Sequence, residues 1–461
     1  CNGIFHNYAQ FVYGYGKYDD PGVVNPSELE LINHIKSSLR SIVTKCKPTD
    51  NFILAPDGVA VTAKMNQQKS RRFMNAPSSD RAFDSNQFTP GTQLMVTLDN
   101  SLNEWINKNK DILPSNIIYS SHLDQGEGEH KIFEFIRQKK IKNPNKGAHL
   151  LYGLDSDLII LSLLSHLNNL YLVREDYRSV VDINVLRQLV IDRLKFENSN
   201  EKRLIKDFGV LCMFAGNDFL PKFPMFTEVK EFLDQIIVIY KENGKHIVDR
   251  SNNVNFEVLM SIFSKLNDVE DEMIVRAGQM HSFPYPEVRK CLDRLGQFDS
   301  QKFTNLWNCK QFGPATGELA NFYRDHRYYN EQDIGQMVIT FLKTIQWVHK
   351  YYTEGFTKVS NTHFYPYFYT PLVKSVYSII KMIYSDKEKR KRRIQKLHDV
   401  GNTNNVELTA IHQLLSVIPP ISKSIIPSEF DGAYDFMTPI NPLNFEIKRE
   451  GTSADWHKIP I

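Results

Sequence analysis

The sequence predicts an α/β fold in which a central, mostly parallel sheet is flanked by helices and joined to a largely helical second lobe. Two observations predict this fold. Short apolar runs alternate with helical patterns in the first half of the chain, and helical periodicity dominates from about residue 187 onward. Strands that alternate with helices over short connections are typical of a parallel sheet covered by helices. In such sheets a ligand site lies beyond the carboxyl ends of the strands.

Three apolar runs are the expected strands. Residues 52–55 (FILA) end at a Pro-Asp-Gly turn, and residues 149–153 (HLLYG) come shortly before a second pair of acids. Residues 170–173 (LYLV) follow the apolar helix after those acids. Apolar residues at helical spacing predict helices over residues 202–214 and 336–352.

The composition is that of a globular protein that can bury a large core. The chain has 461 residues, of which 41% are hydrophobic and 24% charged, with a net charge of +3. No apolar run is long enough to span a bilayer, and no secretory signal pattern is present. The five cysteines show no CxxC spacing, which argues against a zinc site or a disulfide framework. We therefore expect an intracellular monomer with no membrane partner.

Six carboxylates recur beside the ends of the expected strands or next to glycines. They are Asp57, Glu127, Glu129, Asp155, Asp157 and Asp218. Magnesium prefers oxygen ligands, and sites with two metal ions need several acids from different elements. Such acids would repel one another strongly without a cation between them. The pattern predicts a magnesium site.

Each acid also has a simpler interpretation. Asp57 fits a turn, and Asp155 or Asp157 fits the cap of the helix that follows. Glu127 and Glu129 fit the favourable end of a helix dipole. Only the recurrence of acids at i, i+2 spacing beside glycines favours a shared site.

A basic face follows the first of these acids. Lys64, Gln68, Arg71 and Arg72 stand at i, i+4, i+7 and i+8, and no acid occurs from residue 58 to residue 79. Guanidinium groups match phosphate oxygens with paired donors, so this face suits a terminal phosphate. A solvated helix face is the alternative, although such faces usually carry interleaved acids.

The motifs at these positions resemble the XRN family of 5′→3′ exoribonucleases. They are CNGIFH (1–6), PDGVAVTAKMNQQKSRRF (56–73), GEGEHKI (126–132), GLDSDLIIL (153–161), FAGNDFLP (214–221), QWVHKYYTEGF (346–356), FYPYFYTP (364–371) and QLLSVIPP (413–420). The resemblance runs through most of the chain in the family's order and is weakest between residues 249 and 329. It implies a FEN/PIN-like nuclease core without the long C-terminal extension of the large cytoplasmic members.

The resemblance also implies roles for individual residues. The six acids above correspond to catalytic metal ligands or their close neighbours, binding two Mg²⁺ ions for which Mn²⁺ can substitute. Lys64, Gln68, Arg71 and Arg72 correspond to the family's 5′-phosphate pocket. His6 corresponds to a residue that stacks on bases, and His363 stands where the family has a stacking tryptophan. A further catalytic Asp is expected immediately before Cys1.

By this resemblance the chain divides into three regions. Residues 1–225 form the metal-binding catalytic nuclease region, residues 226–335 a helical connecting region, and residues 336–461 a second conserved region that packs on the catalytic core. The implied substrate is single-stranded RNA with a 5′-monophosphate, degraded stepwise to mononucleotides. We expect an intracellular location, with the cytoplasm favoured and the nucleus as the alternative.

Two other functions fit the same residues. A structure-specific flap DNA 5′ nuclease shares the acid cluster, but the basic face suits capture of a free end better than a duplex junction. A catalytically inactive RNA-binding scaffold would keep the fold. The presence of all six acids named above argues against this alternative.

Overall fold

The fold was analysed in a computed structural model of the chain. The structure describes residues 1–74, 82–144, 146–153, 155–173, 179–226, 228–279, 287–293, 295–310, 331–367, 369–403 and 405–437. Parts of the predicted connecting and second regions, including residues 311–330 and 438–461, therefore lie outside the described residues.

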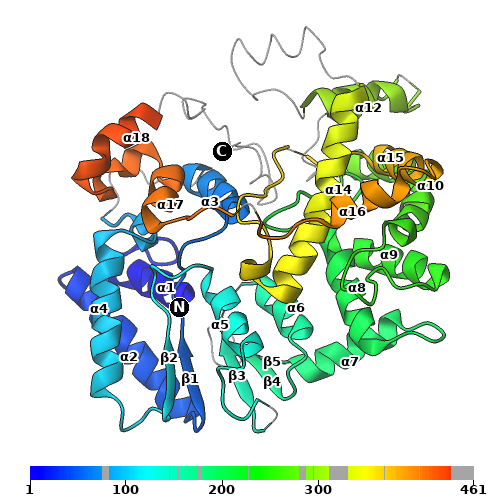
Figure 1. Ribbon diagram of the computed structural model, residues 1–461. Coiled ribbons are helices and arrows are strands. Elements are labelled where there is room, and N and C mark those ends of the chain that lie inside the picture. Colours follow the sequence, from blue (N-terminus) through cyan, green and yellow to red (C-terminus); the bar gives the residue numbers. More distant parts are fainter. Residues whose placement is uncertain are drawn as a thin grey trace.

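Among the described residues, helices predominate and the strands all lie in the first half of the chain (Figure 1). The strands are β1 (Asn51–Leu54), β2 (Asn116–Tyr119), β3 (His149–Tyr152), β4 (Leu170–Val173) and β5 (Val180–Asp182). The helices that accompany them are α1 (Asn2–Tyr13), α2 (Glu28–Cys46), α3 (Thr62–Met74), α4 (Gln93–Lys108), α5 (Gly128–Arg137) and α6 (Asp157–Leu164). The later helices are α7 (Ile183–Leu194), α8 (Glu201–Met213), α9 (Val229–Asn243), α10 (Phe256–Gln279), α11 (Glu287–Lys290), α12 (Ser300–Lys310), α14 (Glu331–Glu354), α15 (Val373–Ser385), α16 (Arg390–His398), α17 (Ala410–Val417) and α18 (Asp431–Met437). Short 3-10 turns lie at η1 (Ser85–Phe88), η2 (Phe356–Lys358), η3 (Pro420–Ile425) and η4 (Ser428–Phe430).

The three predicted strands are confirmed as β1, β3 and β4, but the predicted single central sheet is not formed. β1 pairs in parallel with β2, with Leu54 opposite Tyr119. β3 pairs in parallel with β4, with Leu151 opposite Leu172, and β5 adds to β4 in antiparallel orientation. The described strands therefore form two small sheets, one parallel and one mixed.

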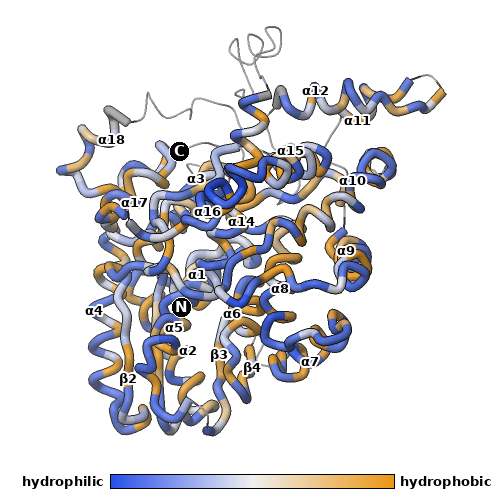
Figure 2. The backbone as a smooth tube through the Cα atoms, turned by 45° about the vertical axis from the view of Figure 1, so that its right-hand side comes forward, coloured by the Kyte–Doolittle hydropathy of each residue, from blue (hydrophilic) through white to orange (hydrophobic). Residues whose placement is uncertain are grey.

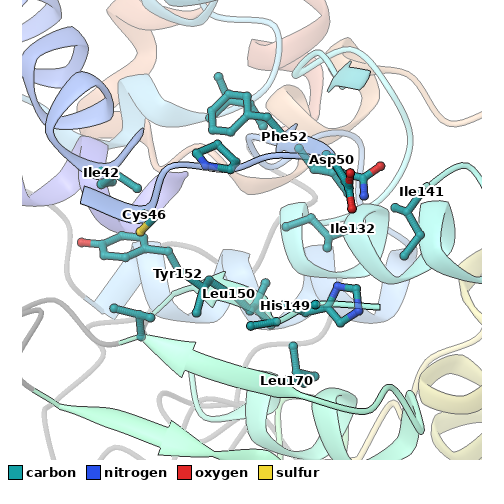
Figure 3. A pocket seen from close by; sticks show the side chains of 18 of the residues that line it. Ile42, Cys46, Asp50, Phe52, Ile132, Ile141, His149, Leu150, Tyr152 and Leu170 are labelled. Carbon is teal, nitrogen blue, oxygen red and sulfur yellow. The ribbon is translucent and has the colours of Figure 1, made fainter. Parts of the chain in front are cut away.

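An apolar groove separates the two sheets (Figure 3). It has a volume of about 370 Å³ and is lined by β1 and β3 on its two sides and by residues of α2 and α5, such as Ile42 and Ile132. Within the described ranges, β1 pairs only with β2 and β3 only with β4, so no hydrogen-bonded ladder joins the sheets. The two sheets are held together by the surrounding helices.

Helix α14 links the second half of the chain to the sheets. It packs on α8 and α6, and its lower end in Figure 1 comes down between α5 and α6. Its apolar residues Phe341, Ile345 and Val348 are at most 1% exposed, which confirms the amphipathic helix predicted over residues 336–352. Hydrophobic and hydrophilic segments alternate along helices such as α4 in Figure 2, as expected for helices with one buried face.

A second contact joins the end of the described chain to the predicted basic helix. Helix α17 packs against α3. The Gln413 side chain donates to Gln68 Oε1 at 2.9 Å and accepts from the Ala60 backbone N–H at 2.9 Å. Among the described helices, none is both long and apolar enough to cross a membrane.

Candidate active site

Asp57 lies just beyond the carboxyl end of β1 and is held by two neighbours. Its carboxylate accepts from Asn2 Nδ2 at 2.8 Å and from the Gly128 backbone N–H at 2.8 Å. A Cβ at Gly128 would lie 2.5 Å from the Ala55 carbonyl oxygen, so only glycine allows this approach. The bonds to Asn2 and Gly128 fix Asp57 against two other elements, which a simple turn residue would not require.

Glu127 and Asp218 share one ammonium group. Lys64 Nζ lies 2.5 Å from Glu127 Oε2 and 2.6 Å from Asp218 Oδ2. Burial alone would lower the pKa of Lys64, but Asp218 and Glu127 more than offset this effect and hold it well above its usual value. Lys64 therefore stays protonated. Glu127 is the N-cap residue of α5, yet its side chain makes no capping bond, so capping does not account for it.

Asp155 and Asp157 flank the start of α6, whose N-cap residue is Ser156. The interpretation that either acid caps this helix is therefore wrong. The Asp157 carboxylate accepts from the Tyr352 hydroxyl at 2.9 Å. Burial raises the pKa of Asp157 to about 6, and nearby Asp218 adds to the rise.

The acids outnumber the cations that lie among them. Burial raises the pKa of Glu129 well above its usual value, and the charges of Glu127, Asp57 and Asp155 raise it further. Burial likewise raises the pKa of Glu127 to about 7, although Lys64 opposes the rise. Glu127 resists ionisation mainly because it is buried, and the charges of Asp57 and Asp218 add to the effect.

A pocket of about 370 Å³ joins this acidic cluster to the predicted basic face. Its lining includes seven of the predicted site residues, contributed by α1, α3, α5 and the segments after β1 and β3. They are His6, Asp57, Gln68, Arg71, Arg72, Glu129 and Asp155. Carboxylates and guanidiniums from segments far apart in the sequence thus face one cavity.

Arg71 lies close enough to Arg72 to lower its pKa. Burial and then the charge of Arg71 lower the pKa of Arg72 to about 9, so Arg72 is charged at neutral pH. Arg72 Nη1 donates to Thr89 Oγ1 at 2.6 Å, which orients it. A bound anion would relieve the repulsion between two adjacent cations.

His6 presents a neutral ring to the same pocket. Burial, followed by the charges of Arg71 and Arg72, lowers its pKa to about 4. Its ring lies edge-on to Phe88, with ring centroids 4.9 Å apart. A neutral, braced aromatic ring suits stacking on a base.

The other predicted residues do not line this pocket. Within the described part of the chain, Glu127, Asp157 and Asp218 gather instead around or beside Lys64. Lys64 was expected among the phosphate-binding residues, but the structure places its ammonium in the acidic cluster. His363 accepts or donates a hydrogen bond with Thr344 Oγ1 at 2.9 Å and packs near Trp347 at a ring distance of 5.7 Å.

The acidic cluster offers the donor chemistry of a magnesium site. Its donors are carboxylate oxygens, and burial together with the neighbouring acids raises the pKa values of Glu127, Glu129 and Asp157. In the described residues, no three His, Cys, Asp or Glu side chains converge tightly enough to hold one metal ion as they stand. The acids thus fit the ion chemically, while their arrangement is centred on Lys64.

Several residues of the site escaped the sequence analysis. Asn2 holds Asp57, and the hydroxyls of Tyr351 and Tyr352 donate to Glu127 and Asp157, respectively. The two tyrosines sit on an amphipathic helix, where the pattern indicates only core packing. Their hydroxyl groups were the one available signal, because a buried tyrosine hydroxyl needs a hydrogen-bond partner.

Comparison with known families places most of the chain. Residues 1–82 and 75–176 match the family profile described as XRN 5′-3′ exonuclease N-terminus. Residues 198–288 and 321–460 match the profile described as Xrn1 helical domain.

Individual relatives agree with these profiles. Human 5′-3′ exoribonuclease 1 is 25% identical over 560 positions, covering 100% of this chain and 31% of that protein. The 5′-3′ exoribonuclease 1 of Schizosaccharomyces pombe is 33% identical over 59% of this chain and 24% of that protein. The 5′-3′ exoribonuclease 2 homolog of Drosophila melanogaster is 23% identical over 96% of this chain and 65% of that protein. The chain thus spans less than two thirds of the length of each of these relatives.

Proposed function

Because the chain belongs to the XRN family of 5′–3′ exoribonucleases, we propose that it hydrolyses RNA carrying a 5′-monophosphate, stepwise from that end, to mononucleotides. The observation that carries the proposal is the pocket in which Asp57, Glu129 and Asp155 face Arg71 and Arg72. A terminal phosphate and the first phosphodiester bond need these two kinds of group side by side.

The basic side of the pocket captures the end of the substrate. Arg71 and Arg72 supply paired donors for the oxygens of a terminal phosphate, and Gln68 adds an amide. His6 offers its neutral ring to the first bases. A pocket that binds a terminal phosphate beside the acids directs cleavage to the end of the chain rather than to internal bonds.

The acidic side holds the cofactor. Asp57, Glu127, Glu129, Asp155, Asp157 and Asp218 would hold two Mg²⁺ ions, or Mn²⁺ in their place. When bound, the ions supply an activated water and stabilise the leaving oxygen. Lys64 keeps Glu127 and Asp218 close together. In this proposal residues 1–225 carry the catalytic groups, and α14 and α17 of the second conserved region pack against α6 and α3, respectively.

The test compares three substrates under identical conditions: single-stranded RNA with a 5′-phosphate, the same RNA with a 5′-hydroxyl, and a DNA flap. The expected result is Mg²⁺-dependent release of mononucleotides from the phosphorylated RNA, with the hydroxylated RNA degraded much more slowly. Equal rates on both RNA ends would contradict the phosphate pocket. Preferential cleavage of the flap would favour the DNA nuclease, and binding without degradation would favour the inactive scaffold.

A further inference from the structure

Two adjacent tyrosines of α14 reach the acidic cluster from the second half of the chain. Tyr351 donates its hydroxyl hydrogen to Glu127 Oε1 at 2.9 Å, and Tyr352 donates to Asp157 Oδ2 at 2.9 Å. We infer that Tyr351 and Tyr352 are positioning residues that orient Glu127 and Asp157 for a divalent cation. The inference rests on the proposed metal site and assigns part of it to the helical region.

The rings are fixed by packing, so the hydroxyl groups have little freedom. Tyr351 is 1% exposed and Tyr352 is 4% exposed. Tyr351 stacks on Trp347 with ring centroids 4.9 Å apart and an interplanar angle of 13°. His130 of α5 lies 4.1 Å from the Tyr351 ring and 5.8 Å from the Tyr352 ring. Phe219, next to Asp218, lies edge-on to Tyr351 at 5.3 Å.

Helix geometry explains how one helix serves two acids. Successive residues of an α-helix point about 100° apart, since one turn takes 3.6 residues. Tyr351 therefore faces Glu127 at the start of α5, while Tyr352 faces Asp157 at the start of α6. A single helix, α14, therefore sets the distance between the carboxylates at the starts of α5 and α6.

The two tyrosine hydrogen bonds each occupy one oxygen of a carboxylate, and so they set which way the other oxygen points. At Glu127, Tyr351 engages Oε1 while Oε2 faces the Lys64 ammonium at 2.5 Å. At Asp157, Tyr352 engages Oδ2. Hydrogen bonds of this kind orient metal ligands, and their loss typically costs about 10- to 100-fold in metal affinity or activity.

A matched control exists elsewhere in the molecule. The Tyr240 hydroxyl donates to Asp207 Oδ2 at 2.6 Å, and both residues are 0% exposed. Tyr240→Phe therefore removes the same chemical contact, a buried tyrosine hydroxyl on a carboxylate, outside the acidic cluster. Any effect of losing such a bond on folding alone should appear in all three single variants.

The experiment measures Mn²⁺ binding without RNA, by the loss of the free-ion electron paramagnetic resonance signal, in the full chain. Tyr351→Phe and Tyr352→Phe should each weaken binding by about 10- to 100-fold. Tyr240→Phe should bind Mn²⁺ as the unmodified protein does, and thermal unfolding should verify that every variant is folded. With phosphorylated RNA, the Tyr351 and Tyr352 variants should need more Mg²⁺ at an unchanged KM for RNA.

Two results would overturn the inference: unchanged Mn²⁺ affinity in folded Tyr351→Phe and Tyr352→Phe, or an equal loss in Tyr240→Phe. The proposed function can fail separately. If the unmodified protein binds Mn²⁺ but does not degrade phosphorylated RNA, the binding comparison still decides the role of the tyrosines. Absence of Mn²⁺ binding by the unmodified protein would overturn the positioning role together with the metal site.

Discussion

In two buried clusters of this protein, carboxylates accept hydrogen bonds from tyrosine hydroxyls. The clusters differ in whether neighbouring donors and cations balance the charge of the carboxylates. Asp207 of α8 stands alone and accepts from Tyr240, from His246 Nδ1 at 2.6 Å and from the Val248 backbone N–H at 2.7 Å. The Asn200 N–H donates to His246 Nε2 at 2.9 Å, which leaves Nδ1 as the ring nitrogen that donates to Asp207. Every hydrogen-bonding group in this cluster has a partner.

In the acidic cluster, the neighbouring groups do not balance the negative charge of the carboxylates. Glu127, Asp157 and Asp218 surround the single ammonium of Lys64, and the two tyrosine hydroxyls do not supply the missing charge. Burial raises the pKa values of Glu127 and Asp157, and neighbouring acids raise them further. A satisfied buried acid serves the scaffold, whereas an excess of buried acids creates a demand for a cation. The predictions below test that distinction.

The largest effect is expected for Asp155→Ala combined with Asp157→Ala. Loss of direct ligands should exceed the cost of losing their orienting neighbours, so degradation of phosphorylated RNA should fall by more than about 100-fold. The melting temperature should change little, because relief of carboxylate repulsion offsets the loss of the acceptor for the buried Tyr352 hydroxyl. The exposed Asp192→Ala is the control. A double variant that degrades RNA at the full rate would contradict the proposed metal site.

The opposite behaviour is expected for Asp207→Ala. This change leaves three buried donors without an acceptor, and each such group costs about 1–3 kcal/mol. Urea unfolding should show a loss of at least about 2 kcal/mol, while the folded fraction keeps its Mn²⁺ affinity. If Mn²⁺ affinity fell in proportion to stability, Asp207 would not differ from the acidic cluster in its role, and the distinction between the two clusters would be wrong.

Arg71→Ala combined with Arg72→Ala should separate end capture from metal binding. Hydrogen bonds to charged groups contribute about 1.5–3 kcal/mol, so preference for a 5′-phosphate over a 5′-hydroxyl should drop by about 10- to 100-fold. Mn²⁺ affinity should stay within a few-fold of that of the unmodified protein. The contrary outcome is an unaltered end preference in the double variant.

The smallest effect is expected from pH. Burial raises the pKa of Glu127 to about 7 and that of Asp157 to about 6, and a cation binds only the deprotonated groups. Mn²⁺ affinity should therefore rise as pH increases from 6 to 8, by up to about tenfold per unit where one proton is released, and level off above that range. A flat profile between pH 6 and 8 would show that these carboxylates are not the ligands.

The sequence predicted the strands and the acids that follow them because both depend on local patterns. β1, β3 and β4 begin and end within one or two residues of the predicted runs, and Asp57 and Asp155 face the same pocket. The separation into two sheets was not predictable, since strand pairing depends on contacts between distant segments. A run of apolar residues does not specify which edge it pairs with.

The placement of Lys64 shows a second limit. The spacing on α3 assigned it to the same face as Arg71 and Arg72, but a flexible four-carbon side chain reaches Glu127 and Asp218 instead. Tyr351 and Tyr352 were missed for a related reason, because helical periodicity identifies a buried side chain but not its polar partner. Both assignments depend on elements far apart in the sequence, since Asp218 lies 154 positions from Lys64 and Glu127 lies 224 positions from Tyr351.

The most direct test of the central claim is anomalous diffraction from crystals of the protein soaked with Mn²⁺. The account predicts anomalous peaks among the carboxylates of Asp57, Glu127, Glu129, Asp155, Asp157 and Asp218, and none at Asp207. Peaks only at other positions, or a cluster that remains centred on Lys64 with no bound ion at saturating Mn²⁺, would contradict it.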